Sequence, residues 1–209
     1  MDTVTGVKVK MPRSKVSIWE QADVDAYVWA AAWKGQPWIG ALILTEWEIG
    51  QRLTDAVLFR REAEYKAADG VFRFWQSKTQ GYVTIPVSDR LRGVLAACAV
   101  SGSPYLFHDG ATGRPFPDVS RLSHVFEDIR DAVVAGGGRR LVLRALRHSC
   151  VVQLARCGCT VPEIASITGH SLKTIEEILK HYLGLHPDLA RSAIGKLVSW
   201  FEDQKGEGA

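Results

Sequence analysis

The spacing of apolar residues changes twice along this 209-residue chain, and that change constrains its fold more than any other feature. Residues 24–47 carry apolar side chains at helical spacing, with a break at 35–37. Residues 71–87 instead alternate around a turn at 79–81, which predicts a β-hairpin within a three-stranded sheet. Helical spacing returns from residue 89 onward. The sequence therefore predicts an α+β fold, mainly helical with a small three-stranded antiparallel sheet.

Individual helices can be placed within the helical regions. Residues 38–47 are too apolar to face water on most sides, so the helix that they form should be buried. Further helices are expected at 89–100 and 118–134, and everything after residue 143 is predicted to be helical. Gly169 suits the left-handed position that ends a helix.

The charge balance excludes a strongly basic, tail-driven nucleic-acid binder. The formal net charge is only +3 and the isoelectric point is about 8.7. Any DNA contact must therefore come from local clusters, although most charge runs simply face water. The clusters are Arg13 to Lys15, Arg60-Arg61, Arg90 with Arg92, and Arg139-Arg140 running into Arg144 and Arg147.

The chain shows neither a candidate membrane span nor a secretion signal. No stretch approaches the roughly 20 apolar residues of a span, and the first ten residues lack an apolar core. A cytosolic protein with reduced thiols is therefore expected. The pair Cys157-Gly158-Cys159 lacks the two-residue gap of a zinc knuckle, and no second pair stands at a fitting distance. We expect no metal and no other cofactor.

Arg147 has both a functional and an ordinary explanation. It falls at the edge of the apolar stripe of a helix predicted from residue 143 to 157. The stripe consists of Leu146, Cys150, Leu154 and Cys157. An inward-pointing arginine needs a carboxylate or an anionic ligand. A side chain that reaches the surface, or one that pairs with Asp55 or a nearby glutamate, would also satisfy the pattern.

Further polar positions are equally ambiguous when each is taken alone. Arg52 and Asp55 would stack on one helix face, as many such pairs do. Lys78 lies at the tip of the predicted hairpin, where lysines are ordinarily solvated. His170 can be a helix cap. Tyr182 falls in an apolar stripe, as a core tyrosine with its hydroxyl at the rim would.

The order of these residues resembles that in the catalytic domain of tyrosine recombinases, the phage-integrase family. The matching motifs are Gly50-x-Arg52-x-x-Asp55, Lys78 in a β-hairpin, Arg144-x-x-Arg147-His148, Gly169-His170, and Tyr182. The resemblance covers residues 16–200, nearly the whole chain.

The resemblance implies how these residues would cut DNA. Tyr182 would attack a DNA phosphate and form a 3′-phosphotyrosyl bond, which conserves the energy needed to rejoin the strand. Arg52 and Arg147 would hold the charge that builds on the phosphoryl oxygens. Lys78 would protonate the 5′-oxygen as it leaves.

The resemblance gives the remaining positions supporting roles. His170 would hydrogen-bond the phosphate, Asp55 would brace the site without touching DNA, and His148 is a structural neighbour. Arg144 stands where the family most often has histidine, and it can donate to phosphate but cannot act as a base near neutral pH. The gap from His170 to Tyr182 exceeds the common spacing by about one helical turn.

The resemblance also implies a domain organisation and partners. Residues 17–204 would form the catalytic domain, 1–16 an extended leader and 205–209 a disordered tail, with the N-terminal core-binding domain of the family absent. The substrate would be double-stranded DNA, in the cytoplasm and nucleoid of a bacterium that carries a phage or other mobile element. The apolar helix at 187–201 resembles the element through which protomers dock in a tetrameric synapse.

Two other functions fit the same residues. Arg144, the long gap before Tyr182 and the missing core-binding domain also suit a catalytically inactive remnant that binds DNA or regulates. A type IB topoisomerase shares the residues and the chemistry but relaxes supercoils without exchanging partners. The integrase-like run from Thr168 to Ser171 favours a recombinase over a topoisomerase.

Overall fold

The computed structural model describes residues 17–76, 81–98, 102–109, 112–116, 119–182 and 187–206. The expected leader at 1–16, the predicted general acid Lys78 and residues 207–209 lie outside the described residues. The elements are α1 (Gln21–Trp33), α2 (Pro37–Ile49), α3 (Leu53–Ala56), β1 (Tyr65–Lys66), β2 (Val71–Gln76), β3 (Gly81–Pro86), α4 (Asp89–Ala97), α5 (Val119–Ala135), the 3-10 turn η2 (Leu143–Ala145), α6 (Leu146–Arg156), α7 (Val161–Thr168), α8 (Leu172–Tyr182) and α9 (Pro187–Gly206).

One antiparallel sheet in the order β1-β2-β3 accompanies the helices, which confirms the predicted α+β fold. The register pairs Phe72 of β2 with Ile85 of β3. Phe72 and Phe74 are buried, whereas Arg73 and Trp75 are exposed. The alternation in the sequence therefore corresponds to a strand with one buried face.

The helix α2 lies at the centre of the core. Its apolar sequence predicts burial, and every residue from Ile39 to Trp47 is buried. It packs against α1, α4 and α6. At Gly40 an added Cβ atom would lie 3.3 Å from the carbonyl oxygen of Val28, so this glycine permits the close approach of α1.

The helix α6 is covered on two sides, by α2 and by α7 with α8. The single apolar stripe predicted for it is therefore only partly right. Leu146 and Cys150 are buried, but Leu154 is half-buried and Cys157 is exposed. A single apolar stripe is typical of a helix with one buried side. The helix α6 is buried on more than one side, because it lies between the main core and a second cluster that contains Val151.

Two aromatic residues fix the backbone that leads into η2. Trp19 and Tyr27 are fully buried, with ring centroids 4.6 Å apart. The Tyr27 hydroxyl donates to the carbonyl oxygen of Arg139 at 2.8 Å and accepts from the backbone N–H of Leu141 at 3.1 Å. Trp19 Nε1 donates to the carbonyl oxygen of Val142 at 3.1 Å. These bonds position the turn from which α6 starts.

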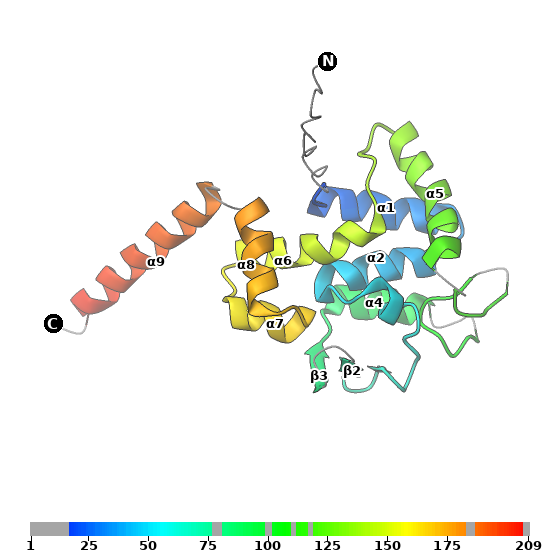
Figure 1. Ribbon diagram of the computed structural model, residues 1–209, viewed down its shortest axis with the longest axis horizontal. Coiled ribbons are helices and arrows are strands. Elements are labelled where there is room, and N and C mark those ends of the chain that lie inside the picture. Colours follow the sequence, from blue (N-terminus) through cyan, green and yellow to red (C-terminus); the bar gives the residue numbers. More distant parts are fainter. Residues whose placement is uncertain are drawn as a thin grey trace, which may run out of the picture.

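The helix α9 extends away from the body of the domain (Figure 1). Its large apolar side chains from residue 194 onward are between 46% and 60% exposed; they are Ile194, Leu197, Val198, Trp200 and Phe201. None of the described helices combines the length and the apolarity needed to cross a bilayer.

Candidate active site

Arg147 contacts the ends of two other helices from the first turn of α6. Its Nε donates a hydrogen bond to His170 Nε2 at 3.2 Å, and its Nη1 donates to the carbonyl oxygen of Gly50, the residue after α2. Burial lowers the pKa of the guanidinium to about 10, so it stays charged at neutral pH. No carboxylate of the described residues lies within ion-pair distance of this guanidinium.

His170 is held in one tautomer by its neighbours. The Thr168 hydroxyl donates to the carbonyl oxygen of Ile164 at 2.8 Å, so its oxygen accepts from His170 Nδ1 at 2.9 Å. His170 Nε2 then carries no proton and accepts the hydrogen bond from Arg147. To donate to a phosphate oxygen, Nε2 has to gain a proton and release Arg147.

Two glycines allow the helix ends to meet at this point. Gly50 follows α2 and Gly169 follows α7, both in the left-handed conformation, with φ of 54° and 66°. A Cβ atom on Gly50 would lie 2.9 Å from both Cβ and Sγ of Cys150, and one on Gly169 would overlap the amide of Gln76. Backbone conformation and close contact therefore both require glycine.

We expect Gly50→Ala to lower the free energy of unfolding by about 2–4 kcal/mol, because left-handed strain adds to overpacking against Cys150. Gly35→Ala is the matched control. Gly35 has a φ of 70° but no atom within 4 Å of an added Cβ, so only the strain of about 1–2 kcal/mol should appear. Urea denaturation of both variants measures the difference, and equal losses would contradict the contact.

Buried amides join the helix ends to the sheet. Gln51 Nε2 donates to the carbonyl oxygens of Ile49 at 2.8 Å and Ile167 at 2.7 Å. Its Oε1 accepts from Gln76 Nε2 at 3.0 Å. Gln76 is the last residue of β2, so the hairpin is anchored to the ends of α2 and α7. Lys78 follows two positions later in the sequence.

A cleft of about 280 Å³ opens beside Arg147. Arg52, just before α3, and Arg144 of η2 line it as well, so three arginines border one space. Arg52 Nη1 lies 3.7 Å from Asp55 Oδ2, and such a partly exposed pair is weak. Arg144 is exposed and has no carboxylate partner in the described part of the chain. The lining residues are Glu46, Gln51, Arg52, Leu53, Thr54, Leu143, Arg144 and Arg147.

The other described arginines of the predicted basic clusters are engaged elsewhere. Their partners are Glu64 for Arg60, the Leu95 carbonyl for Arg61, Asp25 for Arg90, Asp89 for Arg92, Asp23 for Arg139 and Asp131 for Arg140. The run from Arg13 to Lys15 lies outside the described residues. Three cations around one cleft, with a single weak carboxylate contact among them, form a site that favours an anion.

Tyr182 lies apart from the cleft. It is the last residue of α8 and packs against the second core cluster, with its ring centroid 6.3 Å from that of His148. Burial raises the pKa of its phenol. Burial and then the charge of Arg147 lower the pKa of His148, which follows Arg147 on α6. The structure therefore brings Arg52, Arg144, Arg147 and His170 together and places Tyr182 beside His148.

Sequence reasoning missed three residues that shape the site: Glu46, Gln51 and Thr168. Glu46 is 1% exposed and lines the cleft, and its Oε1 has no hydrogen-bond partner among the described residues. The sequence feature that indicates Glu46 is a carboxylate inside the apolar stretch 38–47. Gln51 and Thr168 adjoin recognised motif residues, but their residue types do not indicate the contacts that they make.

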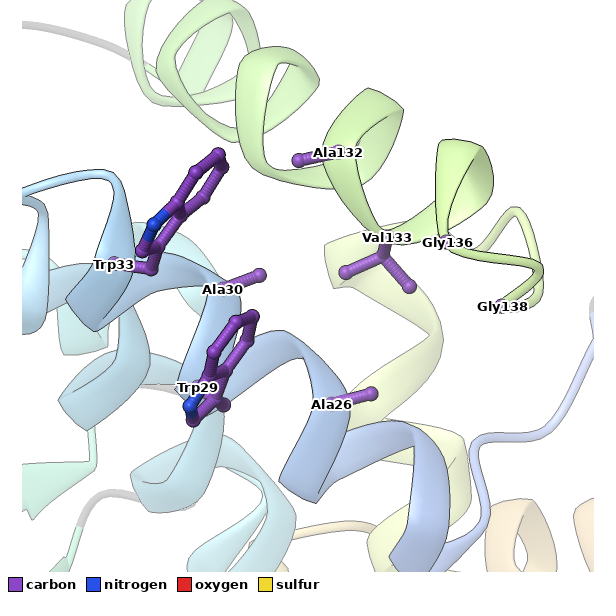
Figure 2. Close-up of a pocket in the computed structure, with 8 residues that line it drawn as sticks. All are labelled: Ala26, Trp29, Ala30, Trp33, Ala132, Val133, Gly136 and Gly138. Carbon is purple, nitrogen blue, oxygen red and sulfur yellow. The ribbon is translucent and has the colours of Figure 1, made fainter.

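A second hollow, between α1 and α5, has a different character (Figure 2). Its described lining is apolar and includes the indole rings of Trp29 and Trp33. These side chains are 68% and 67% exposed, and their rings stack with centroids 6.3 Å apart. The lining contains no charged side chain that could act on a phosphate.

Comparison with known proteins identifies the fold. No family model and no curated protein matches the sequence. Among solved structures, the XerA recombinase has a TM-score of 0.66 at 16% identity, over 88% of this chain and 66% of that chain. The catalytic domain of bacteriophage HP1 integrase has a TM-score of 0.58 at 19% identity, over 87% and 95%. A lambda integrase tetramer bound to a Holliday junction gives 0.59 at 18% identity, over 78% and 49%.

The chain therefore has the fold of tyrosine recombinase catalytic domains. It matches nearly the whole length of the HP1 catalytic domain, 95% of that chain. It spans 66% of the XerA recombinase and 49% of the lambda integrase chain.

Proposed function

We propose that this chain is the catalytic domain of a site-specific DNA recombinase, or integrase, of the tyrosine type. The observation that carries the proposal is the cleft bordered by Arg52, Arg144 and Arg147. A DNA phosphodiester in this cleft supplies the anion that the three cations lack. The fold shared with the XerA recombinase and the HP1 integrase domain supports the same assignment.

The proposed reaction is a transesterification at phosphorus. The Tyr182 hydroxyl oxygen attacks and its proton passes to solvent, and the bond from phosphorus to the 5′-oxygen breaks as the 3′-phosphotyrosyl bond forms. Lys78 gives a proton to the 5′-oxygen as it leaves. Arg52 and Arg147 donate hydrogen bonds to the non-bridging oxygens, where negative charge builds, and Arg144 adds a third donor. A 5′-hydroxyl from another strand reverses these steps and rejoins the DNA.

The supporting residues act through the arginines and the nucleophile. Asp55 braces Arg52, which it contacts at 3.7 Å. His170 accepts a hydrogen bond from Arg147 and, once Nε2 is protonated, donates to the bound phosphate. His148 packs beside the ring of Tyr182 and supports it from α6.

The position of Tyr182 implies that DNA binding and cleavage are separate steps. Its phenol packs beside His148 and does not line the cleft. For attack, the end of α8 has to move until the phenol reaches the phosphate held by Arg147. DNA favours that arrangement because the bound phosphate and the attacking phenol interact only there.

The function is tested with a nicked suicide substrate, in which the strand beyond the cut is too short to be held for rejoining. The substrate carries the core site of the mobile element. We expect a covalent protein–DNA adduct that survives denaturing electrophoresis, without added ATP. DNA binding with no adduct, in a chain that includes any core-binding segment, would favour the inactive remnant. Relaxation of supercoiled DNA without a partner site would favour the topoisomerase.

We further propose that α9 mediates self-association on DNA, in a tetrameric synapse. Its exposed side chains Leu197, Trp200 and Phe201 form an apolar surface on a helix that extends away from the domain. Such a surface is usually covered by a partner. The lambda integrase of the same fold was solved as a tetramer on a Holliday junction, which supports this arrangement. We propose that the reaction takes place in the bacterial cytoplasm, because the substrate would be the DNA of a bacterial mobile element.

The double variant Leu197→Glu with Phe201→Glu is expected to abolish multi-protomer complexes on DNA while single-protomer complexes persist, because two charges cannot be buried unpaired. Ser199→Glu adds a charge to the same helix away from these two side chains and is the control. Analytical ultracentrifugation with DNA of two core sites separates the species. Unchanged assembly in the double variant would assign self-association to another surface.

A further inference from the structure

Glu46 is a buried carboxyl group in the cleft that the proposed reaction does not use. It comes from α2, is 1% exposed, and borders the same space as Arg52 and Arg147. Its Oε1 has no hydrogen-bond partner, and no ion pair joins Glu46 to Arg147, among the described residues. A buried carboxylate normally pairs with a cation within reach, so the separation of these two groups requires an explanation.

Groups of both signs face Glu46 from the elements packed around it. They are Arg147 and Cys150 of α6, Arg52 and Asp55 at α3, Arg144 of η2 and, through Arg147, His170. Burial outweighs the attraction of Arg147 and raises the pKa of Glu46 to about 8, with a further contribution from Asp55. Burial also raises the pKa of the Cys150 thiol, which stays neutral.

We propose that Glu46 is a positioning residue whose proton determines how strongly the arginine cleft binds phosphate. As a neutral carboxyl group it leaves the charge of Arg147 uncompensated, so a phosphate can bind that guanidinium. As a carboxylate it competes with the phosphate for Arg147 and repels it. The inference rests on the proposed function, because it assigns the cleft to phosphate.

The direction of the pH dependence follows from this competition. Anion binding raises the pKa of Glu46 further, so Glu46 takes up a proton when the anion binds, and the affinity falls as pH rises. Starting from a pKa of about 8 in the empty cleft, the dissociation constant rises about tenfold between pH 7 and pH 9. The free energy of unfolding depends on the same carboxyl group. It falls as pH rises from the usual glutamate pKa of 4.5 to about 8, because Glu46 is ionised over this range only in the unfolded chain.

The test uses sulfate, which stays a dianion throughout this pH range. Binding is followed by the NMR shifts of the arginine Nε–H groups, which report on the cleft. In the isosteric Glu46→Gln variant, the dissociation constant should change by less than about twofold between pH 7 and pH 9. The free energy of unfolding of this variant should also no longer fall, through residue 46, as pH rises towards 8.

Glu48→Gln is the matched control. Glu48 lies two residues further along α2, and burial raises its pKa as well. Its carboxylate accepts a hydrogen bond from Ser88 Oγ at 2.7 Å, and it does not line the cleft. This variant should keep the full pH dependence of the sulfate affinity.

A wild-type sulfate affinity that is constant from pH 7 to pH 9, or a pH dependence that persists in Glu46→Gln, would overturn the role of Glu46. Failure of sulfate to shift the Arg147 Nε–H signal at any pH would contradict the phosphate cleft and the proposed function with it. The two failures are therefore distinguishable, and neither measurement depends on DNA cleavage.

Discussion

Replacing Tyr182 by phenylalanine should abolish the covalent protein–DNA adduct and leave DNA binding within about twofold of the wild type. The substitution removes only the attacking oxygen. The loss of the adduct should be complete, because no bond to phosphorus can form. The phenol packs against apolar side chains of the second cluster, so the fold should be unaffected. Denaturing electrophoresis of the suicide-substrate reaction measures the effect.

Tyrosines elsewhere in the chain are the controls for this result. Tyr82 is exposed on β3, and Tyr105 is half-buried. Tyr82→Phe and Tyr105→Phe should each form the adduct at the wild-type level. An adduct that persists in Tyr182→Phe and disappears in one of these variants would move the nucleophile to that position.

Arg147→Ala should slow cleavage by about 10³-fold or more, a loss of about 4 kcal/mol of transition-state stabilisation. The variant removes two guanidinium donors at once from the cleft. The same change should alter the free energy of unfolding by no more than about 1.5 kcal/mol. Lost hydrogen bonds to Gly50 and His170 are offset by the removal of a poorly solvated cation. Single-turnover kinetics and urea denaturation provide the two measurements.

Arg140→Ala is the matched control for charge. Arg140 is exposed and pairs with Asp131 at 3.0 Å, so this variant loses the same formal charge away from the cleft. It should retain cleavage within about threefold, since an exposed ion pair contributes little. Equal losses in Arg140→Ala and Arg147→Ala would show that net charge, and not the cleft, supports the reaction.

The types of the secondary-structure elements could be predicted because each reflects a local period of apolar residues. The alternation from Val71 onward corresponds to β2 and β3, and the apolar run in α2 corresponds to a central buried helix. The burial of α6 could not be predicted in the same way. Its second covered side depends on where α7 and α8 pack, which no local pattern encodes.

The same distinction, between local sequence patterns and packing, applies to the candidate site. Motif order predicts Arg52, Arg144 and Arg147 as site residues. The hydrogen bonds of Arg147 could not be predicted, because they require α2 and α7 to end at the same point in space. The ionisation of Glu46 depends on its burial, and burial is a property of the packed core.

The most direct test of the proposed covalent intermediate is to identify the residue that is joined to DNA. After trapping on the suicide substrate and digestion with trypsin and nuclease, mass spectrometry locates the peptide that carries a nucleotide. We expect one modified peptide, from the end of α8, with the 3′-phosphate on Tyr182. A nucleotide on any other residue, or binding to the substrate with no modified peptide, would contradict this expectation.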